Sequence, residues 1–170
     1  MNLPARHKPL YKAAVDRYSF RPARMEDVDG IVALWPEHWA EAHYADRGIE
    51  PDEGRYRDWV ELTIKYGTQP RLLAIDDYSG RVVGFFAYSL DHNFSTRPVA
   101  VMGTFFVARS HRRSAVPAIL FDLGIDMAKA DGACAFHAPI TSETMSSRAL
   151  ENSFRKHGFT QIGTMMGRAL

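Results

Sequence analysis

The sequence predicts an α/β (α+β) fold, in which a central, mixed and twisted sheet of about six to seven strands is flanked by about four helices. The first observation is an apolar run at residues 99–107, rich in β-branched and aromatic side chains and typical of a buried strand. A basic turn and an amphipathic helix follow it, and then a strand at residues 133–138. Such a crossover favours parallel neighbours. Two earlier apolar runs around a turn at residues 77–80 indicate an antiparallel hairpin, so the sheet is expected to be mixed.

The first part of the chain predicts one strand and two helices. Residues 18–22 predict a short strand, which Pro22 places near a sheet edge or at a strand end. Apolar residues recur with helical spacing over residues 28–35, and Pro36 breaks or restarts that helix. A second helix is expected at about residues 52–65. Its expected buried stripe consists of Tyr56, Trp59, Val60 and Thr63.

The later elements follow from the same patterns. The helix after Ala115 should bury one face of regularly spaced apolar residues. Gly67, Gly80 and Gly132 mark expected helix ends or turns. The expected buried face of the helix is Val116, Ile119, Leu120, Leu123 and Met127. The other expected elements are strands at residues 71–75, 81–90 and 160–166 and a helix at about residues 145–157.

Composition restricts the class of protein. The 170 residues fit one domain, expected at residues 18–170, with residues 1–17 as an N-terminal tail or arm. A net charge of +1 argues against a protein built mainly to bind nucleic acid. No apolar run is long enough to span a membrane, and a single cysteine excludes an intrachain disulfide, so we expect a cytoplasmic protein. That cysteine, Cys134, is expected to be a small buried side chain in mid-strand, and no Cys/His spacing indicates a metal site.

The turn after the central strand concentrates positive charge and hydroxyl groups over residues 109–114. A turn that enters a helix presents unpaired backbone N–H groups and the positive end of the helix dipole, which suits a phosphate. Strand, turn and helix together resemble the cofactor motif of the GNAT acetyltransferase superfamily, whose turn has the form Arg/Gln-x-x-Gly-x-Gly/Ala. Here the turn reads Arg112-Arg113-Ser114-Ala115-Val116-Pro117, with the arginine present and both glycines replaced, so the acetyl-CoA motif is degenerate.

The resemblance extends over roughly residues 20–166. The expected element order β, α, α, β, β, β, α, β, α, β is that of the GNAT fold. The opening Phe-Arg-Pro-Ala at residues 20–23 and the ending Lys-His-Gly-Phe at residues 156–159 are also similar to the family. The acidic Ala-Glu-Ala-His-Tyr stretch at residues 40–44 resembles the bacteriophage-encoded members.

The resemblance implies acetyl-CoA as cofactor. In such a site, backbone groups of the central strand would pair with the pantetheine arm, and amides of the turn would hold the pyrophosphate. Arg112 and Arg113 would add charge-assisted contacts. Pro117 is acceptable at the first helical turn but removes one N–H donor, so weakened cofactor binding is expected. The implied cofactor-binding residues are Phe105, Phe106, Val107, Arg112, Arg113, Ser114, Ala115, Val116, Pro117 and Phe154.

Acetyl transfer to an amine also needs a proton acceptor and a proton donor. The central strand lacks the glutamate that is common in the family, so Glu41 is the first candidate for the base and His38 the second. The other candidates for the base are His43, Asp91 and His92. Phe154 stands where the family often has a tyrosine acid, and Ser147 stands at a position often occupied by asparagine. The Ser147 hydroxyl is therefore expected to do part of the acid's work.

Two functions are compatible with these residues. The first is an N-acetyltransferase that moves an acetyl group from acetyl-CoA to a primary amine of a small molecule or protein. The second is a catalytically impaired GNAT-fold binding or regulatory module that retains CoA. A nucleic-acid contact through the basic turn is disfavoured by the near-neutral charge of the chain. A homodimer formed through the final strand and tail is left open.

Overall fold

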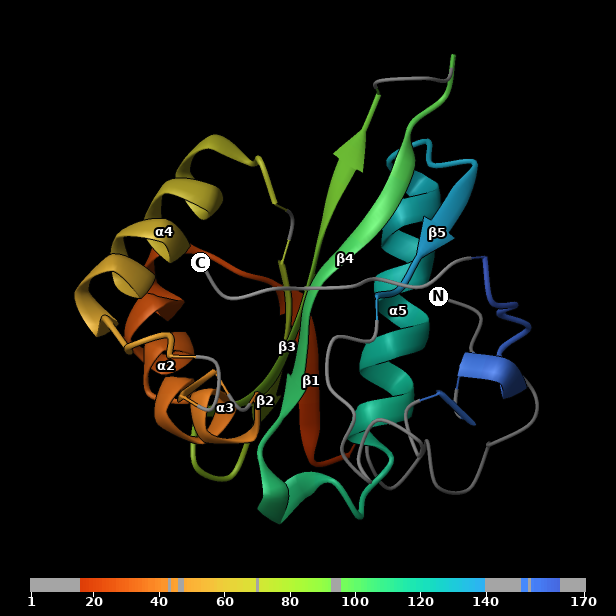
Figure 1. The fold of residues 1–170 in the computed structure, drawn as a ribbon. Helices are drawn as coiled ribbons and strands as arrows, with labels where there is room; N and C mark the ends of the chain where they lie inside the picture. Colours follow the sequence, from red (N-terminus) through yellow and green to blue (C-terminus); the bar gives the residue numbers. More distant parts are fainter. Residues whose placement is uncertain are drawn as a thin grey trace.

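The computed structural model describes residues 16–42, 44–45, 48–69, 71–92, 96–139, 151–152 and 154–162. Within these residues the fold is a mixed five-stranded sheet with the order β1-β2-β3-β4-β5 (Figure 1). The first four strands pair antiparallel, and β4 pairs with β5 in parallel. The predicted mixed α+β fold is confirmed, with five strands in the described part of the chain where six to seven were expected in all. The strands are β1 (Tyr18–Pro22), β2 (Arg71–Asp76), β3 (Arg81–Asp91), β4 (Val99–Val107) and β5 (Ala135–His137).

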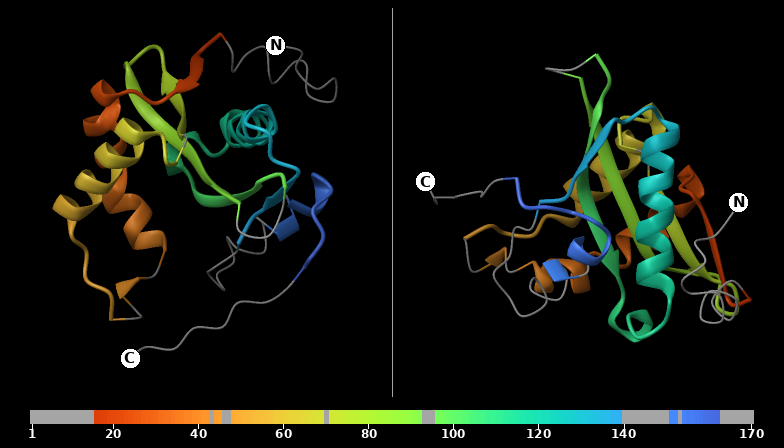
Figure 2. Two further views of the ribbon diagram at one scale, coloured as in Figure 1. Left: turned by 90° about the horizontal axis from the view of Figure 1, so that it is seen from above. Right: turned by 90° about the vertical axis from the view of Figure 1, so that its right-hand side faces the viewer.

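Helices cover both faces of the sheet. Figure 1 shows the sheet nearly edge-on, with α2, α3 and α4 on one side and α5 on the other, and the view from above in Figure 2 agrees. Each side has its own apolar core, one with Ile31, Val60 and Phe85 and the other with Phe86, Ile119 and Leu120. Up to residue 139, the helices are η2 (Met25–Asp27), α2 (Val28–Val32), α3 (Trp35–Glu41), α4 (Glu53–Tyr66), η4 (Arg109–His111) and α5 (Val116–Ala130) among the described residues.

Local chemistry explains where α4 begins and ends. Asp52 caps α4 because its side chain accepts a hydrogen bond from the backbone N–H of Arg55 at 2.9 Å. Gly67 ends the helix in the left-handed conformation, at φ 63°. Of the expected stripe on α4, Tyr56, Val60 and Thr63 are buried and Trp59 is half-buried.

The N-terminal helix differs from the expectation. Instead of one helix over residues 28–35, a 3-10 turn leads into the short α2, and α3 restarts at Trp35 with Pro36 in its first turn. Pro36 has no N–H, which the first turn of a helix does not need but a continuous helix does. The expected tail is anchored at its end, because the Arg17 guanidinium pairs with the Asp76 carboxylate at 3.2 Å.

Differences also occur toward the C-terminus. Residues 151–152 and 154–156 are helical, within the helix expected at 145–157. Residues 160–162 are not extended in a strand, and the rest of the expected strand at 160–166 lies outside the described residues. Cys134 is exposed rather than buried, because β5 begins only at Ala135 and residue 134 belongs to the turn before it. There the Cys134 N–H bonds to the Pro98 carbonyl at 2.9 Å.

Candidate active site

The edge of β4 that faces β5 is largely without a partner strand. β4 pairs with β5 only from Val99 to Val101, so within the described residues no strand pairs with this edge over residues 102–107. Gly103 is the extra residue of a β-bulge, because Ala87 and Tyr88 of β3 lie opposite Thr104 and Met102. Backbone N–H and C=O groups on an unpaired edge are available to an extended ligand. This edge includes the predicted pantetheine-binding residues Phe105, Phe106 and Val107, although the Val107 carbonyl already accepts a hydrogen bond from Arg112 Nε.

The turn after β4 is held by its own side chains. The Ser114 hydroxyl donates to the His111 carbonyl at 2.6 Å and accepts from the backbone N–H of Val116 at 3.2 Å. Since Pro117 has no N–H, the first two positions of α5 have no donor left for a phosphate. The turn is tied to β1 as well, through a 2.9 Å hydrogen bond between the Tyr18 hydroxyl and His111 Nδ1.

Two carboxylates of α3 lie on the basic turn. Glu41 accepts hydrogen bonds from Arg109 Nε at 2.6 Å and Arg112 Nη2 at 2.5 Å. Glu37 accepts from the backbone N–H of Arg109 at 2.7 Å. Arg112 Nε in turn donates to the carbonyl of Val107 at 2.6 Å, which closes the end of β4 against the turn. We call Glu37, Glu41, Arg109 and Arg112 the acid clamp.

The two arginines of the acid clamp lower the pKa of Glu41. Burial alone would raise the pKa of Glu41, but the hydrogen bonds from Arg112 and Arg109 outweigh it and leave the pKa below its usual range. The sequence named Glu41 and Arg112 as separate base and cofactor residues, and the structure brings them into direct contact.

His38, also on α3, lies in an aromatic environment. Its ring lies 5.2 Å from Phe106 and 5.7 Å from Trp35, measured between ring centroids. Nδ1 is buried and has no hydrogen-bond partner among the described residues. Burial lowers the pKa of His38 to about 4, with Arg112 adding to the effect and Glu41 opposing it. The imidazole is therefore neutral at pH 7.

The other predicted site residues do not join this group. Phe154 is buried and stacks on Phe121 of α5, with ring centroids 5.1 Å apart. Asp91 and His92 are exposed at the opposite end of β4 from the basic turn, since Asp91 pairs with Val99. His43 and Ser147 lie outside the described residues. Arg113 is exposed, and no ion pair reaches it from the part of the chain that the structure describes.

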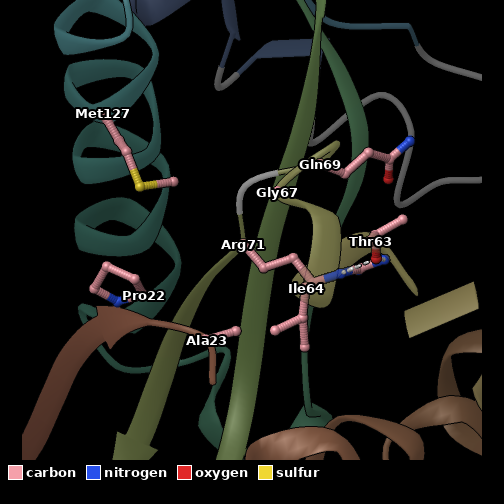
Figure 3. Close-up of a pocket in the computed structure, with 8 residues that line it drawn as sticks. All are labelled: Pro22, Ala23, Thr63, Ile64, Gly67, Gln69, Arg71 and Met127. Carbon is pink, nitrogen blue, oxygen red and sulfur yellow. Dashed lines mark hydrogen bonds between the residues drawn. The ribbon is translucent and has the colours of Figure 1, made fainter. Parts of the chain in front are cut away.

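The sequence did not predict a cavity of about 180 Å³ between the end of α4, the start of β2 and α5 (Figure 3). Arg71 and Gln69 line it, and neither residue stands in a recognisable motif. The signal that could have found them is a charged residue at the start of a strand expected to be buried. The remaining lining residues are Pro22, Ala23, Thr63, Ile64, Gly67 and Met127.

The described residues hold no group of three or more His, Cys, Asp or Glu side chains that could bind a metal ion. None of their helices has the length and apolar character needed to cross a membrane.

The mixed sheet and the β4–turn–α5 arrangement are those of a GNAT-type fold. Residues 31–159 match the acetyltransferase (GNAT) family. Because this match covers most of the chain, the protein belongs to that family. No curated protein sequence matches the chain.

Solved structures are similar in fold. One is a crystal structure of a probable acetyltransferase, 18% identical with a TM-score of 0.69, covering 89% of this chain and 96% of that chain. A second is the aminoglycoside N-acetyltransferase AAC(6')-Iy in complex with CoA, 14% identical with a TM-score of 0.70 and coverages of 89% and 93%. A third is a predicted acetyltransferase with acetyl-CoA from Clostridium acetobutylicum, 13% identical with a TM-score of 0.65 and coverages of 89% and 95%. At these identities the likeness shows the fold alone.

Proposed function

We propose that the protein transfers an acetyl group from acetyl-CoA to a primary amine of a small molecule or protein. The observation that carries the proposal is the unpaired edge of β4 at residues 102–107, which runs directly into a basic turn and the N-terminus of α5. An acyl-pantetheine arm carries amide groups, and such groups can bond to a free strand edge as an added strand does. The diphosphate at the other end of CoA suits the basic turn.

The residues of the basic turn differ in how well they can bind the diphosphate of CoA. Arg112 is engaged by Glu41 and the Val107 carbonyl, so its proposed role is to hold the turn against β4. Arg113 is the exposed cation left for the pyrophosphate. The Ser114 hydroxyl accepts the Val116 N–H and is proposed to exchange that bond for one with a phosphate oxygen. We therefore propose that this turn binds acetyl-CoA more weakly than a turn with both family glycines would.

Acetyl-CoA would supply the activated thioester. The chain's own contribution is proposed to be the binding edge of β4, the closed turn and the position of α3. Glu41 is assigned here to positioning, because a carboxylate with two arginine partners and a lowered pKa is a weak proton acceptor. His38, which is half-buried and neutral, is also a weak proton acceptor because its pKa is lowered to about 4. A cytoplasmic location is part of the proposal, since the chain has one cysteine.

The alternative of a CoA-binding module without catalysis rests on one observation. Phe154, at the position where the family often has a tyrosine acid, is buried in an aromatic cluster with Phe121 and Phe159 and has no proton to give. An enzyme built on this chain would have to protonate the leaving thiolate from water or from another residue.

The experiment that separates the two readings is an acetylation assay. The protein is incubated with acetyl-CoA and a panel of primary amines, and release of the CoA thiol is followed with a chromogenic reagent. Acetylated product, identified by mass spectrometry and dependent on Arg113, is the expected result. Acetyl-CoA binding without any product across the panel would support the regulatory module instead.

A further inference from the structure

Arg71 is a buried cation without a counter-charge. The residue is 3% exposed at the start of β2. Its guanidinium lies over the Trp59 ring at 4.2 Å and donates to the Thr63 hydroxyl from Nε at 3.3 Å and Nη2 at 3.1 Å. Nη1 has no acceptor among the described residues, and none of their carboxylates pairs with the group. Buried charges are normally paired, because an uncompensated one costs several kcal/mol.

Gln69 has a buried hydrogen-bond acceptor without a donor among the described residues. Its Oε1 is buried and accepts no hydrogen bond from the described residues. This oxygen lies beside the β4 bulge, since a carbon added to Gly103 would sit 3.6 Å from it. Gln69 is therefore an unused acceptor at the point where β4 leaves β5, next to the edge proposed to hold the acyl arm.

Both residues line the same cavity, and its polar groups lie together. In Figure 3 the side chains of Arg71, Thr63 and Gln69 extend to one side, while Met127 and Pro22 lie on the other. Arg71 pairs with Ala87 across the sheet, and Ala87 pairs with Thr104 beside the bulge. Arg71 thus lies two strands away from the bulge, at about 10 Å, and Gln69 Oε1 is the polar group of the cavity that lies beside the edge of β4 proposed to hold the acyl arm.

We propose that this cavity binds the acetyl acceptor, and that the acceptor is a small amino carboxylate such as a free amino acid. The inference rests on the proposed function. The carboxylate bonds to Arg71, whose planar guanidinium matches a carboxylate in geometry as well as charge. The amino group bonds to Gln69 Oε1, which directs it toward the Gly103 bulge. A peptide N-terminus has no carboxylate beside its amine, so it satisfies only one of the two groups.

Binding to the protein without acetyl-CoA tests the inference directly. Calorimetric titrations use the standard amino acids, β-alanine and 4-aminobutyrate, each up to about 10 mM, a range that detects millimolar affinity. The best ligand is then compared with its carboxamide, which keeps the amine and loses the negative charge. We expect the acid to bind at least about tenfold more tightly than the amide, because charge-assisted bonds are the stronger kind.

Variants assign the effect to the two residues. Arg71→Met should lower the affinity of the acid at least about tenfold and remove the preference over the amide, whereas Arg71→Lys should lose less. Gln69→Leu should weaken both ligands, because it removes the acceptor for their common amine. Arg81→Met, at the exposed start of β3, removes an equal charge and should change nothing. Melting curves show which variants are folded, and the acid–amide comparison on the parent protein needs no variant.

The inference is overturned if no amino carboxylate binds the parent, if acid and amide bind equally, or if folded Arg71→Met binds the acid as the parent does. Acetyl-CoA is titrated in the same preparation. Binding of acetyl-CoA without an amino carboxylate contradicts this inference and leaves the proposed function standing. The reverse result contradicts the use of acetyl-CoA and leaves the amino carboxylate site.

Discussion

At the scale of single residues, neighbouring groups decide what Glu41 and His38 can do. Glu41 has the chemistry of a base, but two arginines share its carboxylate. His38 has a side chain that ordinarily titrates near neutral pH, but an aromatic shell holds it neutral. Glu41 therefore ties α3 to the basic turn, whereas His38 packs α3 against β3 and β4, and both contributions can be measured.

The acid clamp predicts that Glu41→Gln loosens the turn. The variant should lower the free energy of unfolding by about 1–2 kcal/mol, because Arg112 loses a half-buried charged partner. It should raise the KM for acetyl-CoA with kcat changed less than about tenfold, whereas loss of a general base would cost about 10²–10⁴ in turnover. Glu26→Gln is the matched control, since Glu26 and Arg24 form an exposed pair worth little. Equal melting temperatures for the two variants would contradict the clamp.

The lowered pKa of His38 predicts that the stability of the fold depends on pH between about 6.5 and 4. Its pKa is lowered to about 4 in the folded protein, so between pH 6.5 and 4 the unfolded chain binds a proton that the folded one does not. Stability is therefore complete above the ordinary pKa and falls as the pH decreases through this window. From pH 7 to pH 5 the loss should be about 2 kcal/mol. Denaturant titrations of the parent and of His38→Phe measure it, and an equal loss in both proteins would exclude His38 as the cause.

The sequence could name chemically suited residues but could not place them together. Glu41 and Arg112 were selected for separate roles, because their contact joins residues far apart in the chain. Arg71 and Gln69 were missed, because the environment that makes them unusual is created by α4 and the β4 bulge. Burial and missing partners are properties of the fold, and no spacing in the sequence records them.

At the scale of elements, periodicity predicted the sheet well and the interrupted helices less well. β4 has the expected bounds, because a continuous apolar run leaves little ambiguity about a buried strand. The break between α2 and α3 was ambiguous, since Pro36 fits both a helix end and a first turn. β5 is shorter than its apolar run because the turn after Gly132 takes up the first residues.

The packing of α5 on β3 gives a prediction at this scale. A carbon added to Gly124 would lie 2.4 Å from the ring of Phe86, which is fully buried. Glycine to alanine within a helix ordinarily stabilises by about 1 kcal/mol, but here the ring must move. Gly124→Ala should therefore destabilise by about 1–3 kcal/mol in a denaturant titration.

Gly54→Ala in α4 is the control for Gly124→Ala. The nearest atom to an added carbon at Gly54 is Asp52 Oδ1 at 3.4 Å, an ordinary contact with a flexible side chain. This variant should leave stability unchanged or raise it. If Gly124→Ala is as stable as Gly54→Ala, α5 does not approach β3 as closely as described.

At the scale of the whole molecule, the sheet connects the proposed binding sites for the cofactor and for the acceptor. α5 and its core support the turn proposed for the pyrophosphate, α3 contributes two residues of the acid clamp, and the Arg71 cavity lies between the end of α4, the start of β2 and α5. β4 belongs to both, since Phe106 packs under α2 and α4 and Val107 packs in the core of α5. Cofactor and acceptor are thus proposed to meet at the bulge of one strand.

The most direct test of this account is the melting temperature of the protein with acetyl-CoA. At a ligand concentration about a hundredfold above Kd, binding adds about 2.7 kcal/mol, which for a chain of this size raises the melting temperature by roughly 5–10 °C. Arg113→Ala should remove most of the rise, Pro117→Gly should enlarge it by adding a backbone donor, and Arg81→Ala should leave it unchanged. No rise in either the parent or Pro117→Gly, with both proteins folded, would contradict acetyl-CoA binding at the β4–α5 turn.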